Sequence, residues 1–138
     1  MNFFKSFAIS GSGMTAERLR LDLISNNIAN VHTTRTPEGG PYRREVPVFA
    51  QQLERTRRGL EGAGVRVEAV VKDPSPPRVV YQPGHPDADA AGYVAYPNVD
   101  VNREFIDLIS ASRAYEANAA VLEAAKQITS RALELGRG

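Results

Sequence analysis

The residues best suited to metal chemistry lie in one short stretch, HPDAD at positions 85–89. This stretch places an imidazole next to two carboxylates two residues apart, which matches part of a calcium-binding loop. Such a loop also needs a bidentate glutamate at its twelfth position, and the sequence has none there. We therefore expect Asp87 and Asp89 to stabilise a turn by bonding to the backbone, with no metal bound near His85.

No other group of residues has the spacing of a catalytic site. His32 is the only other histidine, and the sequence has no cysteine to act as a nucleophile or metal ligand. It also lacks a serine nucleophile elbow, a glycine-rich phosphate loop and a spaced pair of histidines. A small metal-dependent enzyme built around His85 would have no third ligand and no base. We expect no enzymatic activity, no cofactor and no small-molecule substrate.

Arg55, Arg57 and Arg58 form the strongest basic cluster in the chain. Acidic residues flank the cluster, no aromatic residue lies between the arginines, and the net charge of the chain is only +1. Nucleic-acid sites combine a clear excess of positive charge with a suitable fold or motif. The cluster therefore indicates a solvated face available to another subunit, and we expect no nucleic-acid partner.

A long helix must form the C-terminal part of the chain. After Asn102 there is no proline, and the next glycine is Gly136, so nothing interrupts a helix of about 33 residues, or roughly 50 Å. Asp100 or Asn102 can cap its start, and Glu104 places a negative charge in the first turn, where it suits the helix dipole. We expect this helix to end at Gly136.

Apolar and small residues repeat every seven positions along this C-terminal helix. Three neighbouring rows form a stripe about 100° wide, which is the width of a packing face. The rows are Leu108, Tyr115, Leu122 and Thr129; Ala111, Asn118, Ala125 and Ala132; and Ala114, Val121, Ile128 and Leu135. A helix of this length needs a partner, either as an ordinary helix of a bundle or as an element of a coiled coil.

A second helix is expected over residues 3–31, where apolar residues recur with the same period. Phe7, Met14, Leu21 and Ile28 form one row, and Phe3, Ile24 and Val31 lie on the neighbouring row. Gly11 and Gly13 weaken its first third by up to about 1 kcal/mol each relative to alanine, so we expect this part to become ordered only on binding. The two helices should form an antiparallel pair, with Tyr115 and Leu122 packed against Leu21 and Ile28.

The middle of the chain is predicted to contain short strands and loops. Residues 31–44 have the prolines, glycines and threonines of a loop. Strands are expected at 45–49, where Pro47 favours a sheet edge, and at 64–72, 78–82 and 93–96. Residues 50–60 have no pattern that assigns them to helix or strand.

The predicted fold is mostly α with a small β insert. Long N- and C-terminal helices pack as an antiparallel coiled-coil pair, with short strands and loops between them. Residues 1–31 and 98–138 would form a domain of paired helices, and residues 32–97 would form an outer segment.

Composition also indicates a compartment. No run of 18 apolar residues is present, so no membrane span is expected. The N-terminal residues include Phe3, Phe4 and Phe7, but serines and glycines interrupt them, so the continuous apolar region of a cleaved secretion signal is missing. From composition alone, the chain is expected to be cytoplasmic.

Two further motifs resemble those of a known family. The stretch LISNNIANVHTT at 23–34 resembles the N-terminal signature of the bacterial flagellar axial proteins, and SRAYEAN at 112–118 is shared across that family. The chain continues with TPEGGPYRR, in which Tyr42 is displaced by an insertion. That longer form, together with residues 85–127, is similar to the rod proteins of the flagellar basal body.

The resemblance implies a structural subunit of the proximal rod that stacks helically with copies of itself and other rod proteins. The terminal helices would line the axial channel and the middle segment would face outward. It also implies export through the flagellar type III apparatus without a cleaved signal, and a final location in the periplasmic part of the rod. The alternatives are another rod or hook-type subunit, or a cytoplasmic coiled-coil adaptor of an export apparatus.

The residues expected to carry packing and assembly come from both termini and from the first loop. They are Phe7, Met14, Leu21, Ile24, Ile28, Ala29, Asn30, Thr33, Tyr42, Leu108, Tyr115, Asn118, Leu122, Ala125 and Ile128.

Overall fold

The structure is a computed structural model that describes residues 3–138. Its elements are α1 (Phe3–Ala29), β1 (Glu45–Thr56), β2 (Gly59–Lys72), β3 (Arg78–Tyr81), β4 (Tyr93–Tyr96) and α2 (Val101–Arg137). The N-terminal segment predicted from the sequence begins at residue 1, and residues 1–2 lie outside the described part.

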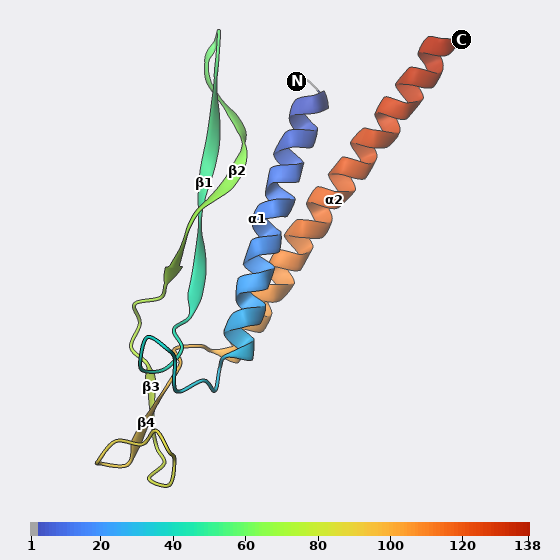
Figure 1. The fold of residues 1–138 in the computed structure, drawn as a ribbon. Helices are drawn as coiled ribbons and strands as arrows, with labels where there is room; N and C mark the ends of the chain where they lie inside the picture. Colours follow the sequence, from blue (N-terminus) through green and yellow to red (C-terminus); the bar gives the residue numbers. More distant parts are fainter. Residues whose placement is uncertain (1–2) are drawn as a thin grey trace.

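Two long helices and two β-hairpins make up the molecule (Figure 1). The helices α1 and α2 run antiparallel and side by side, and the hairpin of β1 and β2 lies along the other side of α1. The tip of that hairpin points the same way as both chain termini, whereas the small hairpin of β3 and β4 lies at the opposite end. The predicted fold class, paired terminal helices with a β insert, is confirmed.

The start of α2 agrees with the sequence and its end does not. Oδ1 of Asp100 accepts hydrogen bonds from the backbone N–H groups of Asn102 (3.0 Å) and Arg103 (3.4 Å), which makes Asp100 the N-cap. The helix continues through Gly136 to Arg137, so the predicted stop at Gly136 is wrong. A glycine ends a helix when it takes the left-handed conformation, and Gly136 does not take it.

The first helix is continuous through both glycines and ends at Ala29, two residues before the predicted boundary at residue 31. Gly13 faces α2, where a Cβ atom would lie 2.9 Å from Nδ2 of Asn118. This glycine lowers intrinsic helix propensity, but it lets the two helices approach closely.

The hairpin of β1 and β2 is longer than the sequence predicted. The two strands pair antiparallel from Glu45↔Lys72 to Thr56↔Gly59, with register shifts at Val48/Phe49 and Gln52/Leu53. Residues 50–60, which had no assignment, therefore form the outer half of the hairpin and its turn. Cross-strand pairing holds these residues extended, and the register shifts interrupt the alternation by which a strand is recognised.

The small hairpin confirms two predicted strands. Arg78 pairs with Tyr96 and Tyr81 with Tyr93, and Val94 at its centre is fully buried. The strand predicted over residues 78–82 ends one residue earlier, because the N–H of Gln82 donates to the carbonyl of Gly92 and closes the loop between the strands.

The register of the helix pair differs from the expected one. Asn118 lies against Gly13, and Asn27 bonds to Glu104 near the other end of the pair. Because the helices are antiparallel, Leu122 is level with residues that precede Gly13 and is not beside Ile28. Small side chains such as Ala16 and Ala111 are buried between these levels, and Ala125 is buried beyond Asn118, so the contact is close and the core is thin.

No helix within residues 3–138 is long and apolar enough to span a membrane.

Candidate assembly surface and the joint that positions it

A charged cluster holds the outer hairpin to the helix pair. Nε of Arg44, which precedes β1, donates to the carboxylate of Glu104 on α2, and Glu104 is fully buried. Nη2 of Arg44 donates to Asp107 at 3.3 Å, and its Nη1 lies 3.5 Å from Asp73. We call Asn27, Arg44, Asp73, Glu104 and Asp107 the joint.

Asn27 adds the end of α1 to the joint. Its Nδ2 donates to the carbonyl of Glu45 (2.9 Å) and to Oε2 of Glu104 (3.2 Å). Its Oδ1 accepts from the N–H of Glu45 (2.9 Å) and from the hydroxyl of Tyr42 (2.8 Å). One buried amide side chain therefore connects α1, β1 and α2 with its hydrogen-bonding capacity used.

The electrostatics of the joint follow from these partners. Hydrogen bonds from the hydroxyl and the N–H of Ser75 hold the pKa of Asp73 below its ordinary value, and the positive charge of Arg44 adds to this effect. Burial, assisted by the negative charge of Glu45, raises the pKa of Tyr42 to about 12. Tyr42 is therefore a neutral hydrogen-bond donor at physiological pH.

The HPDAD stretch forms the predicted turn, in which Asp89 bonds to the backbone as expected, whereas Asp87 bonds to side chains. Oδ1 of Asp89 accepts from the N–H groups of Ala91 and Tyr93, both at 2.9 Å. Asp87 accepts from the hydroxyl of Thr34 (2.7 Å) and from the Arg35 guanidinium, and these two donors hold the pKa of Asp87 below its ordinary value. Asp87 thus ties this turn to the first loop.

His85 takes part in the same turn. Its Nδ1 accepts from the N–H of Asp87 at 3.0 Å. Among residues 3–138, no three histidine, aspartate or glutamate side chains form a group that could hold a metal ion.

The basic cluster lies at the far end of the long hairpin. Arg57 and Arg58 form its turn, and Arg55 pairs with Leu60 one residue before β1 ends at Thr56. Nearby, Nζ of Lys5 on α1 lies 2.7 Å from Glu61 on β2, and this ammonium holds the pKa of Glu61 below its ordinary value. The arginines are exposed at the tip, and the Lys5–Glu61 pair connects that end of the hairpin to α1.

The predicted packing residues occupy three environments. Ile24 and Ala125 are buried, and Ala29 and Ile128 are exposed. Half-buried positions hold Phe7, Met14, Leu21, Ile28, Asn30, Thr33, Tyr42, Leu108, Tyr115, Asn118 and Leu122.

The residues from the family signature shape the turn after α1. Nδ2 of Asn30 donates to the carbonyl of Asn26 at 2.9 Å, and Oδ1 of Asn30 accepts from the Thr33 hydroxyl at 3.1 Å. The carbonyl of Thr33 accepts from the N–H of Tyr42 at 3.0 Å, which directs the Tyr42 side chain back to Asn27. These residues therefore position the joint.

One flank of α2, beside the row of Ala111, Asn118 and Ala125 that packs against α1, carries an apolar stripe. We call it the outer stripe; it consists of the exposed residues Ile106, Ala117, Val121, Ala124, Ile128 and Leu135. Their spacing of three, four and seven residues places them along one side of the helix. Val121, Ile128 and Leu135 belong to the third predicted heptad row, which thus extends beyond the α1 contact.

Sequence reasoning missed most of the joint. Glu104 was interpreted only as an acid near a helix start, and Arg44 only as part of a loop. The sequence does contain one indication of this contact. Glu104 lies seven residues before Ala111, so heptad spacing puts this carboxylate on the same side of the helix as Ala111, Asn118 and Ala125. A carboxylate at a core position requires a cationic partner.

The family model for flagella basal body rod proteins matches residues 7–35, and that for the C-terminal part of flagellar basal body rod FlgEFG proteins matches residues 90–135. The flagellar basal-body rod protein FlgC of Borreliella burgdorferi is 45% identical, with all of both chains covered. The FlgC proteins of Yersinia enterocolitica and Bacillus subtilis are 43% and 39% identical, each over 99% of this chain and all of the relative.

These matches extend over the helix pair, the joint and both hairpins, and the family is structural and not enzymatic. The chain therefore belongs to the FlgC family of flagellar basal-body rod proteins and is a structural subunit of the rod.

Proposed function

We propose that this chain polymerises helically, with copies of itself and with other rod proteins, to build the proximal part of the rod. In this arrangement residues 1–31 and 98–138 form the axial core and line the export channel, and residues 32–97 face outward. The polymer transmits torque along the flagellar axis.

The outer stripe is the observation that carries this proposal. Its large members are well exposed in the single chain, with 67% of the accessible area of Ile106, 50% of Val121, 52% of Ile128 and 83% of Leu135 open to solvent. Apolar rows of this length on one side of a helix are buried in stable proteins. The alanines between them allow a second helix to approach closely.

The packing residues named from the sequence take two roles in this proposal. The half-buried rows of α1 and α2 hold the helix pair together, and their remaining exposed flanks contact neighbouring subunits. Asn30, Thr33 and Tyr42 position the joint, so that the outer hairpin keeps a fixed direction relative to the axial helices. A subunit that transmits torque requires such a fixed connection.

Membership of the family also supports the route to the rod. We propose that the chain leaves the cytoplasm through the flagellar type III export apparatus without cleavage of a signal, and that it works in the periplasm.

The outer stripe can be tested by Val121→Asp in the native bacterium, with Glu123→Gln as the control on the same helix. Both residues are exposed in the single chain, so neither change should unfold it. We expect Val121→Asp to abolish motility and to remove the chain from detergent-washed basal bodies, while Glu123→Gln leaves both unchanged. Normal motility and normal incorporation of the Val121→Asp chain would contradict the proposal.

A further inference from the structure

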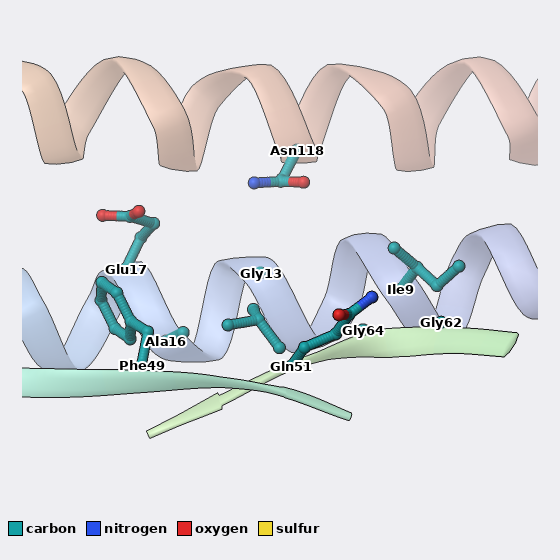
Figure 2. Close-up of a pocket in the computed structure, with 10 residues that line it drawn as sticks. Ile9, Gly13, Ala16, Glu17, Phe49, Gln51, Gly62, Gly64 and Asn118 are labelled. Atoms are coloured by element: carbon teal, nitrogen blue, oxygen red, sulfur yellow. The ribbon is translucent and has the colours of Figure 1, made fainter. Parts of the chain in front are cut away.

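A groove crosses α1 where it meets both α2 and the long hairpin. It has a volume of about 400 Å³, and Figure 2 shows the residues that line it. Figure 2 shows Glu17 and Asn118 between the two helices, and Phe49 and Gln51 on the strand side of α1. The groove therefore lies at the junction of the axial helices and the outer segment.

Glycines keep this groove hollow. Gly13 on α1 and Gly62 and Gly64 on β2 contribute no side chains to its wall. A Cβ atom at Gly64 would overlap the hydroxyl of Ser12, and one at Gly62 would lie 3.0 Å from Nε2 of Gln51. Because these glycines have no side chains, the backbones of α1 and β2 can approach closely, and the volume that side chains would fill stays empty.

Glu17 gives the groove one negative charge with an incomplete set of partners. Its Oε2 is shielded from solvent and accepts no hydrogen bond from any described residue. The nearest guanidinium nitrogen, Nη1 of Arg20, lies 3.5 Å away from it. The walls are otherwise mainly apolar, with Ile9, Ala16 and Phe49 among them. The groove therefore fits an apolar group that also brings a cationic hydrogen-bond donor.

The C-terminal end of α2 has that chemistry, and residues 130–137 are left exposed by the rest of the described chain, residues 3–138. With Gly13 beside Asn118, the first described residue, Phe3, is level with about residue 128, so α2 extends beyond α1 (Figure 1). We call residues 128–137 the overhang. Ile128, Arg131 and Leu135 lie on one side of it, three and four residues apart. Arg131 forms no ion pair with any residue in 3–138.

We propose that the groove of one copy receives the overhang of a second copy, with Ile128 and Leu135 against its apolar walls and Arg131 paired with Glu17. This inference rests on the proposed self-assembly and names the surfaces that meet. A guanidinium offers five donors in a planar fork and would pair with the exposed part of the Glu17 carboxylate, since 16% of this side chain is open to solvent.

The overhang cannot reach the groove of its own chain. Arg131 lies 13 residues beyond Asn118, which is the α2 residue at the groove, and this separation corresponds to about 20 Å along a straight helix. The contact must therefore be intermolecular. It joins two different surfaces, so each copy offers one groove and one overhang, and the contact can continue from subunit to subunit in a ring or an open helix.

A disulfide can test this contact because the natural chain has no cysteine. The variant carries Gln51→Cys at the groove and Leu135→Cys on the overhang, and it replaces the natural chain in the native bacterium. The control carries Lys126→Cys in place of Leu135→Cys, since residue 126 lies on the opposite side of α2. Air oxidation with copper-phenanthroline joins two thiols only when their Cα atoms come within about 7 Å.

We expect covalent multimers in basal bodies from the Leu135→Cys variant and single chains from the Lys126→Cys control. Motile cells whose basal bodies contain no Gln51–Leu135 disulfide would overturn the groove contact and leave the proposed function intact. Multimers of equal yield in both variants would also overturn it. A disulfide-linked partner other than a second copy would show that another rod protein occupies the groove, and the proposal for this chain would be wrong.

A charge exchange tests the Glu17–Arg131 pair itself. In the Gln51→Cys, Leu135→Cys background, Glu17→Lys or Arg131→Glu alone should lower the disulfide yield by about tenfold or more, because each places like charges in contact. The chain with both reversals should recover most of the yield. Far-UV circular dichroism of each purified chain checks that it remains helical. Absence of recovery in helical double-reversal chains would overturn the pairing.

The proposed function has a separate readout in the same strains. The natural chain, returned to cells from which its gene has been removed, should restore motility. Failure of that restoration counts against rod assembly as a whole, and it is independent of any disulfide yield.

Discussion

At the scale of single residues, the joint brings one guanidinium and three carboxylates together in a molecule whose buried apolar core is small. One guanidinium, that of Arg44, contacts carboxylates from α2 and from the segment after β2. Glu104 is fully buried between these elements. A buried ion pair gives little net stability compared with apolar residues, but removal of one partner leaves a charge without compensation.

Arg44→Leu should therefore destabilise the chain strongly. We expect the free energy of unfolding to fall by about 3–5 kcal/mol, measured by chemical denaturation of the purified chain with far-UV circular dichroism. Arg43→Leu is a matched control, because Arg43 is the exposed neighbour in sequence. The double change Arg44→Leu, Glu104→Leu should recover much of the loss, and equal effects of the two single changes would count against the joint.

Tyr42 gives the joint a pH dependence at alkaline pH. Its pKa is about 12 in the folded chain and about 10 for an ordinary phenol, so the unfolded chain loses this proton first. The stabilisation is complete below pH about 10 and is lost progressively as the pH rises through about 12. Tyr42→Phe has no such proton. The difference in unfolding free energy between the natural chain and Tyr42→Phe should shrink across that range, and a constant difference would contradict this assignment.

At the scale of elements, α1 lies between α2 and the long hairpin and contacts both. Ser12 is central to the second contact, because its hydroxyl donates to the carbonyl of Ile9 (2.7 Å) and accepts from the N–H of Val65 (3.0 Å). Gly64, next to Val65, has a φ of +126°, a conformation that disfavours any side chain. A helix and a strand approach here to the distance at which only glycine fits.

Two glycine substitutions should act in opposite directions. Gly64→Ala should lower the free energy of unfolding by about 1–3 kcal/mol, because it combines a strained φ with displacement of Ser12. Gly11→Ala should raise it by up to about 1 kcal/mol, because a Cβ there meets nothing within 4 Å and alanine favours the helix. Thermal unfolding of the two purified variants gives the sign of each change. A stabilising Gly64→Ala would mean that the hairpin does not lie on α1 in solution.

The two helices could be predicted from the sequence, whereas the outer half of the long hairpin and the joint could not. Heptad spacing was sufficient to predict both helices, since a helix contacts its neighbours through one repeating side. The outer half of the long hairpin was not predictable, because Gln51 to Thr56 are extended through hydrogen bonds to a partner strand and not through their own pattern. The joint was not predictable either. Its residues come from four segments, and no local rule reveals that Arg44 faces Glu104.

At the scale of the whole molecule, α2 is the longer helix, with 37 residues against the 27 of α1 that lie within the described residues 3–138. Their joined ends are fixed by the joint, so the whole difference falls at the chain termini. Residues 130–137 are exposed throughout. A helix end of this kind depends on its own backbone hydrogen bonds alone, and short isolated helices are marginal in water.

Hydrogen exchange should reveal this difference between the ends of the molecule. In the isolated chain we expect the amides of residues 130–137 to exchange rapidly and those of residues 104–111 slowly, since the latter lie beside the joint. In assembled rods, residues 130–137 should become protected as neighbouring subunits cover them. Protection of residues 130–137 in a monodisperse monomer would contradict the expectation that this end is ordered by assembly.

The hydrogen bond between Asn27 and Glu104 joins residues 77 positions apart in the chain. The first 104 of the 138 residues must be present before this contact can form. Such non-local contacts slow folding because a long loop must close first. A nascent chain that has reached Arg44 has neither Glu104 nor Asp107 available to hold it. Until residue 107 has been made, the polypeptide therefore lacks the contacts that fix the outer hairpin to the helix pair.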